Sequence, residues 1–276
     1  MPINFSEIGW RDLNERSLRK EIFHGRIFHI QVHPEIVRSL FPELQKNLSL
    51  FFPDNFLNLR FSSQTTHTLL SRFRETMHSK GTLKTIGHSF LKKVLIENHS
   101  QTTNHILADL PRVRSLSPES HLDEKAKKAF YAHRDTWYAN SPSQINLWIP
   151  LHPIDPSNSF VFFPEYFQRS VLNDSAEFKL GEFIHSGGFQ NSLNTNSFPT
   201  TQEIICGGDS FYCDTGEAIV FSAHHLHTTS PNVSLKNRWS MEFRIVYSED
   251  REQGLEAFEL DNMSSGDFTE SFSELI

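Results

Sequence analysis

The pattern at residues 144 to 151 constrains the fold of this chain more than any other feature. Aliphatic residues occupy every second position there, so that Ile145, Leu147, Ile149 and Leu151 alternate with Gln144, Asn146, Trp148 and Pro150. Because successive side chains of a strand point to opposite faces, this period of two predicts a strand with one apolar face and one face that can present polar groups. Such a strand is typical of an antiparallel sheet or barrel.

The surrounding sequence has the same texture from about Asn104 onward. Short extended runs are broken by Pro, Gly and Ser, and three of them predict further strands at Phe160–Phe163, Glu217–Ser222 and Trp239–Tyr247. A Ser-, Asn- and Gly-rich stretch from Ser186 to Asn196 suits a mobile loop or lid.

The first hundred residues have a helical pattern instead. Apolar residues recur at helical spacing in three segments: Ile36, Val37, Leu40 and Leu44; Leu69, Leu70, Phe73 and Met77; and Leu83, Ile86, Phe90, Val94 and Leu95 between Thr82 and Glu97. We expect scaffold helices that support the sheet.

The length of 276 residues fits one catalytic domain, which we place at residues 1–248. Within it, residues 1–103 are expected to form the helical support and residues 104–248 the β core. Residues 249–276 form an acidic C-terminal tail with nine Asp or Glu and one Arg. This tail is expected to be disordered or, because it contains apolar residues, to dock as a helix.

Charge and cysteine content exclude several functions. Outside the tail there are 24 acidic and 25 basic residues, and no Lys/Arg run, so nucleic acid is not an expected partner. No export signal and no membrane span is evident.

Cys206 and Cys213 match no redox or zinc spacing and are expected as free thiols in the cytoplasm, although a local disulfide stays possible. The oligomeric state is open.

Two distant motifs carry the chemistry. His133 and Asp135 stand just before the alternating strand, where side chains two residues apart on extended backbone can chelate one metal. The run Gly216–Phe221 then leads into a cluster at His224, His225 and His227. One imidazole from this cluster would complete a set of two His and one carboxylate, the facial triad of non-haem Fe(II) oxygenases.

With these motifs, residues 104 to 247 resemble the phytanoyl-CoA dioxygenase-like group of Fe(II)/2-oxoglutarate oxygenases. The resemblance rests on His133-x-Asp135, Trp148–Leu151, Asn158–Pro164 and Gly216–Arg238. It implies a mainly β fold with N-terminal helices, in which a double-stranded β-helix (a cupin-like jelly roll) forms the core. It also implies His133, Asp135 and His227 as metal ligands and as the catalytic centre.

The resemblance implies further that Thr229 and Arg238 bind the far carboxylate of 2-oxoglutarate. A buried dicarboxylate needs such a partner on physical grounds, because a guanidinium fork satisfies it bidentately. Arg244 is the competitor on the same face of the strand, but six residues separate the two, roughly 20 Å, so both cannot serve one carboxylate. Asn146 and Gln144 share a face and are candidates for contact with cosubstrate or substrate.

The resulting expectation is a non-haem oxygenase that uses Fe(II), 2-oxoglutarate and dioxygen to hydroxylate an unactivated C–H bond of a small-molecule metabolite, such as an amino acid or a natural-product intermediate. Related halogenases replace the carboxylate ligand with a small residue, so Asp135 favours hydroxylation, with desaturation or cyclisation still open. A non-catalytic metal-binding barrel is the alternative, and a zinc hydrolase is third because no HExxH base is present.

Overall fold

The computed structural model describes residues 6–32, 34–95, 105–118, 120–123, 130–188 and 198–275. Its centre is an eight-stranded sheet of order β1-β2-β7-β5-β9-β3-β10, in which β4 also pairs with β9. Every pair is antiparallel except β1 with β2. The strands are β1 (Ser6–Gly9), β2 (Phe28–Gln31), β3 (Ile106–Ala108), β4 (Arg112–Leu116), β5 (Gln144–Pro150), β7 (Glu217–Ser222), β9 (Arg238–Tyr247) and β10 (Ser273–Glu274).

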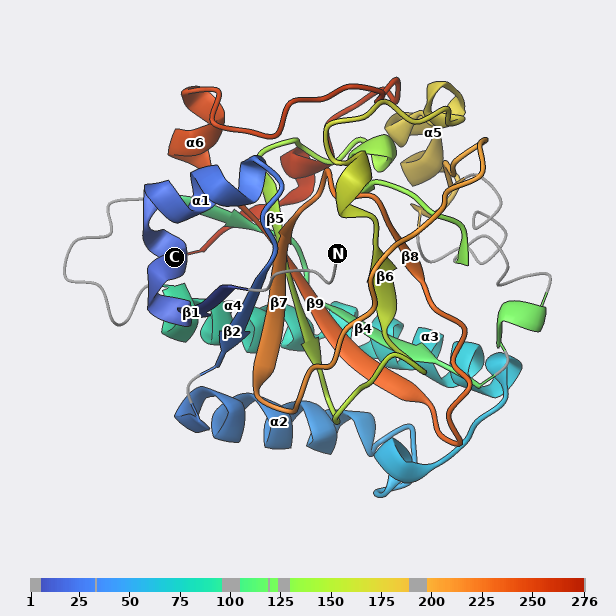
Figure 1. Ribbon diagram of the computed structural model, residues 1–276. Coiled ribbons are helices and arrows are strands. Elements are labelled where there is room, and N and C mark those ends of the chain that lie inside the picture. The colour runs from blue at the N-terminus through green and yellow to red at the C-terminus, as the bar shows by residue number, and fades with distance from the viewer. Residues whose placement is uncertain are drawn as a thin grey trace.

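A second sheet of two strands, β6 (Phe160–Phe162) and β8 (His227–Thr229), faces the first. Figure 1 shows β6 and β8 to the right of the large sheet. Aromatic and aliphatic side chains from both sheets fill the space between them, among them Trp148, Phe162 and Phe221. The fold is therefore a jelly roll, mainly β with N-terminal helices, in which the two sheets stay open and do not close into a barrel.

Helices cover the other face of the large sheet. The odd-numbered residues of β5 and β9 point to this side, where Phe90 of a helix stacks on Phe243 with ring centroids 4.7 Å apart. Trp239 packs edge-on against Phe52 and Phe56. The alternation along each strand thus separates a helix-covered core from a second face that is free to carry polar groups.

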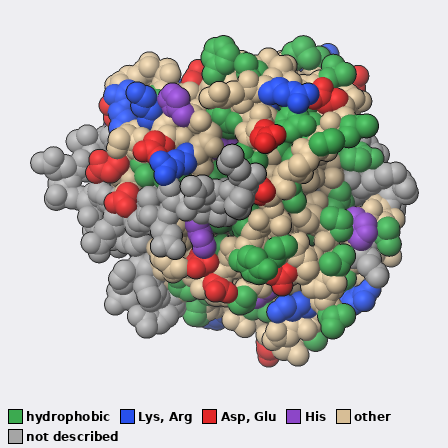
Figure 2. Space-filling model, in the orientation of Figure 1, with side chains coloured by type: hydrophobic (Ala, Val, Ile, Leu, Met, Phe, Trp, Pro, Cys, Tyr) green, Lys and Arg blue, Asp and Glu red, His purple; other side chains and the backbone are tan. Residues whose placement is uncertain are grey.

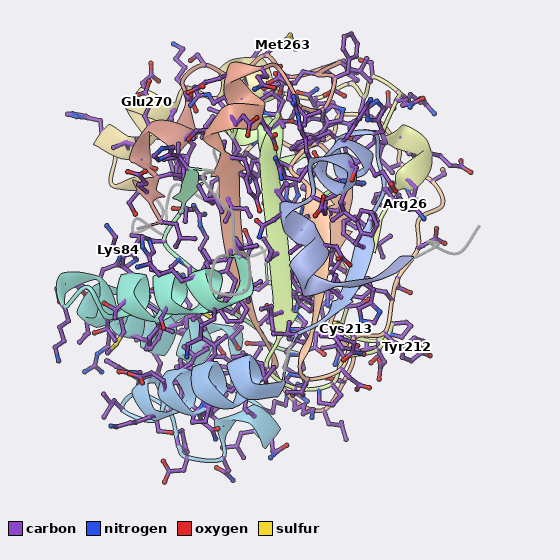
Figure 3. All side chains as sticks on the ribbon, turned by 90° about the vertical axis from the view of Figure 1, so that its left-hand side faces the viewer. Arg26, Lys84, Tyr212, Cys213, Met263 and Glu270 are labelled. Carbon is purple, nitrogen blue, oxygen red and sulfur yellow. The ribbon has the colours of Figure 1, made fainter. Side chains whose placement is uncertain are left out.

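The helices confirm the apolar stripes of the sequence. They are α1 (Arg16–Phe23), α2 (Pro34–Leu48), α3 (Ser63–Ser79), α4 (Thr82–Leu95), α5 (Leu180–His185) and α6 (Ser248–Glu252). Leu40 and Leu44 of α2, Phe73 of α3 and Phe90 of α4 are buried in the core. In Figure 3, Lys84 of α4 and Cys213 lie on opposite sides of the sheet.

The strand predictions are confirmed to within a residue. The strand predicted at Glu217–Ser222 is β7 as expected, β5 and β6 each end one residue earlier than predicted, and β9 begins one residue earlier, at Arg238. Most of the predicted loop at Ser186–Asn196 lies outside the described residues. Cys206 and Cys213 are both free.

The segment after Ser248 packs against the body of the protein along much of its length. Asp250 forms a buried ion pair with Arg19 of α1, Asp261 is buried, and β10 joins the edge of the large sheet beside β3. Apart from α6, the 3-10 turn Phe268–Ser271 and β10, this segment consists of turns and irregular backbone, so it differs from the expected docked helix.

The described surface carries both signs of charge. In Figure 2 the coloured Lys and Arg side chains are scattered among acidic ones on this face. None of the described helices combines the length and hydropathy needed to cross a lipid bilayer.

Candidate metal centre

Three side chains predicted as metal ligands come together between the two sheets. One possible ligand atom each from His133, Asp135 and His227 lies within 4.8 Å of the other two, and Nε2 of His133 is 3.9 Å from Oδ1 of Asp135. The triad lines a cavity of about 160 Å³. Two imidazoles and one carboxylate on one side of a cavity suit an Fe(II) site with open coordination positions.

Backbone pairing explains why residues 94 positions apart meet. His133 and His227 form an isolated antiparallel bridge in which each amide N–H donates to the carbonyl oxygen of the other, at 2.9 and 3.0 Å. The pairing places the two imidazole rings side by side, with centroids 4.4 Å apart. Asp135 then begins a short 3-10 helix, Asp135–Tyr138, which turns its carboxylate back toward both rings.

Hydrogen bonds orient both imidazoles. Nδ1 of His133 lies 3.0 Å from the carbonyl oxygen of Tyr131, and Nδ1 of His227 lies 2.9 Å from that of His225. A carbonyl only accepts, so each Nδ1 is the donor, and Nε2 is the ring atom that remains to bind a metal. Burial, with His227 nearby, lowers the pKa of His133 to about 4, which keeps this ring neutral at pH 7.

The carboxylate of Asp135 is ionised and fixed. Burial alone would raise its pKa, but nearby positive charge, above all the Arg244 guanidinium, outweighs burial and holds the pKa below its usual value. The side-chain amide of Asn146 donates to Oδ2 at 2.6 Å, and that of Gln144 donates to Asn146 at 2.8 Å. Asn146, a candidate for contact with cosubstrate, is thus placed to orient Asp135.

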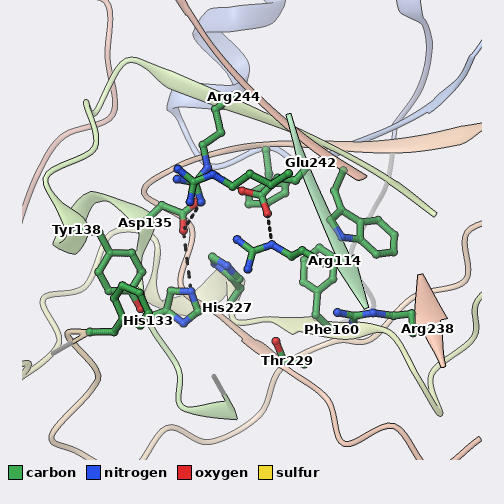
Figure 4. A pocket seen from close by; sticks show the side chains of 14 residues that line it. Arg114, His133, Asp135, Tyr138, Phe160, His227, Thr229, Arg238, Glu242 and Arg244 are labelled. Atoms are coloured by element: carbon green, nitrogen blue, oxygen red, sulfur yellow. Dashed lines mark hydrogen bonds and ion pairs between the residues drawn. The ribbon is translucent and has the colours of Figure 1, made fainter. Parts of the chain in front are cut away.

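The predicted anchor residues line the same cavity. Thr229 follows His227 by two residues on β8, and Arg238 opens β9. Figure 4 shows both on the side of the pocket away from His133. Nη1 of Arg238 donates to the carbonyl oxygens of Asn158 and Ser159, at 3.3 and 3.0 Å.

Arg238 has no carboxylate partner among the described residues. It is 5% exposed, its Nε has no hydrogen-bond acceptor, and burial, with Arg114 nearby, lowers its pKa to about 10. A buried cation without a counter-ion is costly. The position of Arg238 therefore fits an anionic ligand in the cavity.

Arg244, the competing arginine, is already paired. Its Nε donates to Glu242 at 2.7 Å, and its Nη2 lies 3.9 Å from Oδ1 of Asp135. These carboxylates outweigh burial and raise the pKa of Arg244 above its usual value. Arg244 pairs with Glu242 and lies near Asp135, a candidate metal ligand, whereas Arg238 leaves donors for a bound anion.

The other clustered histidines point elsewhere. His225 packs beside Phe167, and its Nε2 lies 3.1 Å from the carbonyl oxygen of Gly25. His224 is fully buried with its ring edge-on to that of Phe167. Neither belongs to the group around His133 and Asp135, although the backbone of His225 orients His227.

Sequence reasoning missed the support behind the triad. Arg134, between the two ligand positions, is fully buried and donates to Asp261, whose other oxygen accepts from Nε1 of Trp137 at 2.8 Å. No local pattern signals a contact across 127 residues.

Arg112 and Arg114 also line the cavity from β4, and their alternation around Val113 was a usable signal.

A second group of metal-binding residue types lies where β2 pairs with the start of β7. His29, Cys213 and Glu217 approach one another, but Glu217 already accepts from Gln31 at 2.6 Å and from the backbone of Asp214 at 2.6 Å. Burial raises the pKa of the Cys213 thiol. We assign no ligand to this group.

Comparisons with known proteins give a distant likeness in structure. No protein-family model and no curated protein matches the chain. EvdO2 from Micromonospora carbonacea var. aurantiaca, complexed with 2-oxoglutarate, is 12% identical over 83% of this chain and 90% of its own, with a TM-score of 0.47. The non-haem alpha-ketoglutarate-dependent epimerase SnoN of nogalamycin biosynthesis is 12% identical over 95% of this chain and 100% of its own, with a TM-score of 0.42. The carbocyclase SnoK of the same biosynthesis is 9% identical over 96% of this chain and 98% of its own, with a TM-score of 0.44.

Proposed function

We propose that the protein is a non-haem Fe(II)/2-oxoglutarate-dependent oxygenase that hydroxylates a C–H bond of a small-molecule metabolite. The observation that carries the proposal is the presence of two features in one cavity. One is the His133–Asp135–His227 triad, and the other is Arg238, a buried cation without a carboxylate partner among the described residues. A site that only stored metal would have no use for a cosubstrate anchor.

The residues present fit the proposed metal and cosubstrate. His133, Asp135 and His227 would hold Fe(II), and Arg238 with Thr229 would bind the far carboxylate of 2-oxoglutarate. The bound iron and cosubstrate supply the oxidising chemistry, with dioxygen as the oxidant. The chain keeps the His133 imidazole neutral, keeps Asp135 ionised, and orients these ligands through Asn146, Arg244 and two carbonyl oxygens.

Aromatic rings define how a substrate would be held near the metal. The ring of Tyr138 lies 5.2 Å from that of His133 and 5.3 Å from that of Phe198, and all three line the cavity. Burial raises the pKa of Tyr138 well above its usual value, so the phenol stays neutral. These rings shield the reacting C–H bond from water on this side.

Binding of 2-oxoglutarate tests the proposal directly. Arg238→Lys keeps the charge but loses the planar fork, and lost charge-assisted hydrogen bonds cost about 1.5–3 kcal/mol, so the half-saturation concentration should rise about 10- to 150-fold. Arg169→Lys on the surface is the matched control. Impairment of Arg244→Lys alone would assign the anchor to Arg244.

Product analysis separates the possible outcomes. Incubation with Fe(II), 2-oxoglutarate and ¹⁸O₂ should give succinate and, with substrate, a hydroxylated product that carries the label. A desaturated or cyclised product that carries no label is the alternative outcome. Metal binding without any succinate would support a non-catalytic metal module.

A further inference from the structure

We infer that the substrate carries a carboxylate or phosphate group, and that Arg114 binds this group. The inference rests on the proposed function, because it places the substrate beside a loaded metal centre. It goes further by naming the chemical class of the substrate. It depends on the position of Arg114, on its hydrogen bonds and on the charge balance of the cavity.

Arg114 projects into the cavity from the middle of β4. On the paired strand β9 it lies opposite Ser240, between the positions of Arg238 and Glu242. Figure 4 shows its guanidinium group in the centre of the pocket, between Glu242 and His227. Its side chain is 44% exposed, so a ligand that enters the pocket can reach it.

One hydrogen bond fixes the guanidinium and leaves its outer end open. Nε of Arg114 donates to Oε2 of Glu242 at 2.8 Å, while Oε1 of Glu242 accepts from Arg244. The two terminal amino groups of Arg114 have no acceptor in the described part of the chain. Such a pair of parallel donors matches the oxygens of a carboxylate or a phosphate.

The cavity stays positive after the proposed cofactors bind. Four arginines line it (Arg112, Arg114, Arg238 and Arg244), whereas the carboxylates at hand in the described part of the chain are Asp135 and Glu242 in the lining and Asp109, which pairs with Arg112 at 2.9 Å. A divalent metal and a dianionic cosubstrate add no net charge. A neutral substrate would leave this excess uncompensated, and an anionic one balances it.

The remaining arginines are committed to other partners. Arg244 is held by Glu242 and Asp135, Arg112 by Asp109, and Arg238 is assigned to the cosubstrate. Glu242, the carboxylate that pairs with Arg114, also pairs with Arg244, so it compensates only part of the charge of Arg114. The carbon skeleton of the substrate would pack against the aromatic rings that line the same cavity.

Small probes test the inference without knowledge of the substrate. Phenylacetate and phenyl phosphate present the two anionic groups on an aromatic ring, and phenylacetamide is the neutral control. Their binding is measured by calorimetry under anaerobic conditions to the Zn(II)-loaded protein, with and without 2-oxoglutarate. We expect at least one anion to bind about 10-fold or more tightly than the amide, because hydrogen bonds to charged groups are the stronger ones.

Variants locate the effect. Arg114→Gln still donates to Glu242 but loses the charge, so the preference for the anion should disappear, whereas Arg114→Lys should keep part of it. Arg169→Gln on the surface should behave as wild type, and circular dichroism confirms the fold of each variant. The tighter of the two anions identifies the group.

Three results would overturn the inference. The first is equal binding of anions and amide, or no binding of the anions, by the wild type. The second is an anion preference that persists in Arg114→Gln. The third is a loss of 2-oxoglutarate affinity in Arg114→Gln larger than in Arg238→Lys, which would assign Arg114 to the cosubstrate. Binding of 2-oxoglutarate to the wild type tests the proposed function separately, because the preference for the anion is also measured in the absence of 2-oxoglutarate.

Discussion

Asp135 is held in place by neighbouring side chains independently of any metal. Asn146 donates to one of its oxygens, and Arg244 lies near the other. Partners of this kind orient ligands, and their loss typically weakens metal binding about 10- to 100-fold. Asn146 and Arg244 therefore belong to the candidate metal centre as much as the three candidate ligands do.

Replacement of this carboxylate should separate chemistry from stability. Asp135→Ala should remove most iron-dependent turnover with little loss of fold, since the side chain is small and lines a cavity. Succinate formation and thermal unfolding measure the two effects, with the exposed Asp54→Ala as control. Asp135→Gly is the variant to test for halide binding. Full turnover in Asp135→Ala would mean that the carboxylate ligand lies elsewhere.

The three clustered histidines should respond differently to substitution. His227→Ala should abolish turnover, whereas His224→Ala and His225→Ala should retain it, because their rings pack away from the triad against Phe167. Turnover and metal stoichiometry are compared for the three variants. A dead His225→Ala beside an active His227→Ala would reverse the assignment.

At the scale of elements, a glycine sets how closely α4 approaches the sheet. A Cβ at Gly87 would lie 2.5 Å from Cγ of Pro111, which precedes β4. Gly87→Ala should therefore destabilise the protein by about 1–3 kcal/mol through overpacking. Gly181→Ala in α5, where a Cβ meets nothing within 4 Å, is the matched control. Urea unfolding of both variants tests this. An equal change in the free energy of unfolding for Gly87→Ala and Gly181→Ala would mean that α4 shifts enough to accommodate the added methyl group.

Individual strands and helices were predictable from the sequence, whereas contacts between distant segments were not. The strand at Gln144–Pro150 and the stripe in α4 were predictable because one apolar face against a core leaves a period of two or of 3.6 residues. The approach of His133 to His227 was predictable only from the resemblance to Fe(II)/2-oxoglutarate oxygenases, not from a local pattern. The roles of Asn146 and Asp261 were not predictable, since each depends on which segments pack together in three dimensions.

At the scale of the whole molecule, the C-terminal segment packs behind the candidate metal centre and supports it. Asp261 accepts from Arg134, from Trp137 and, at 2.9 Å, from the backbone N–H of Val171. Arg134 is fully buried, so it would remain as an uncompensated charge without Asp261. The segment is thus part of the site although it contributes none of the proposed ligands.

Removal of this contact should affect both stability and metal affinity. Breaking a buried ion pair typically costs about 3–5 kcal/mol, and Asp261→Ala should lower the free energy of unfolding by that amount and weaken metal binding, because Arg134 lies between His133 and Asp135. Urea unfolding and metal titration measure the two effects. The exposed Glu256→Ala is the control. Unchanged stability would show that solvent compensates Arg134.

The sheet order also has a consequence for biosynthesis. The first strand lies at one edge of the large sheet and β10 at the other, and Asp250 and Asp261 reach back to Arg19 and Arg134. During translation, the segment that carries His133 and Asp135 leaves the ribosome more than a hundred residues before Asp261 does. The candidate metal centre is therefore completed only when the chain has been synthesised through Asp261. A nascent chain stalled between His227 and Asp261 would carry all three candidate ligands without this support.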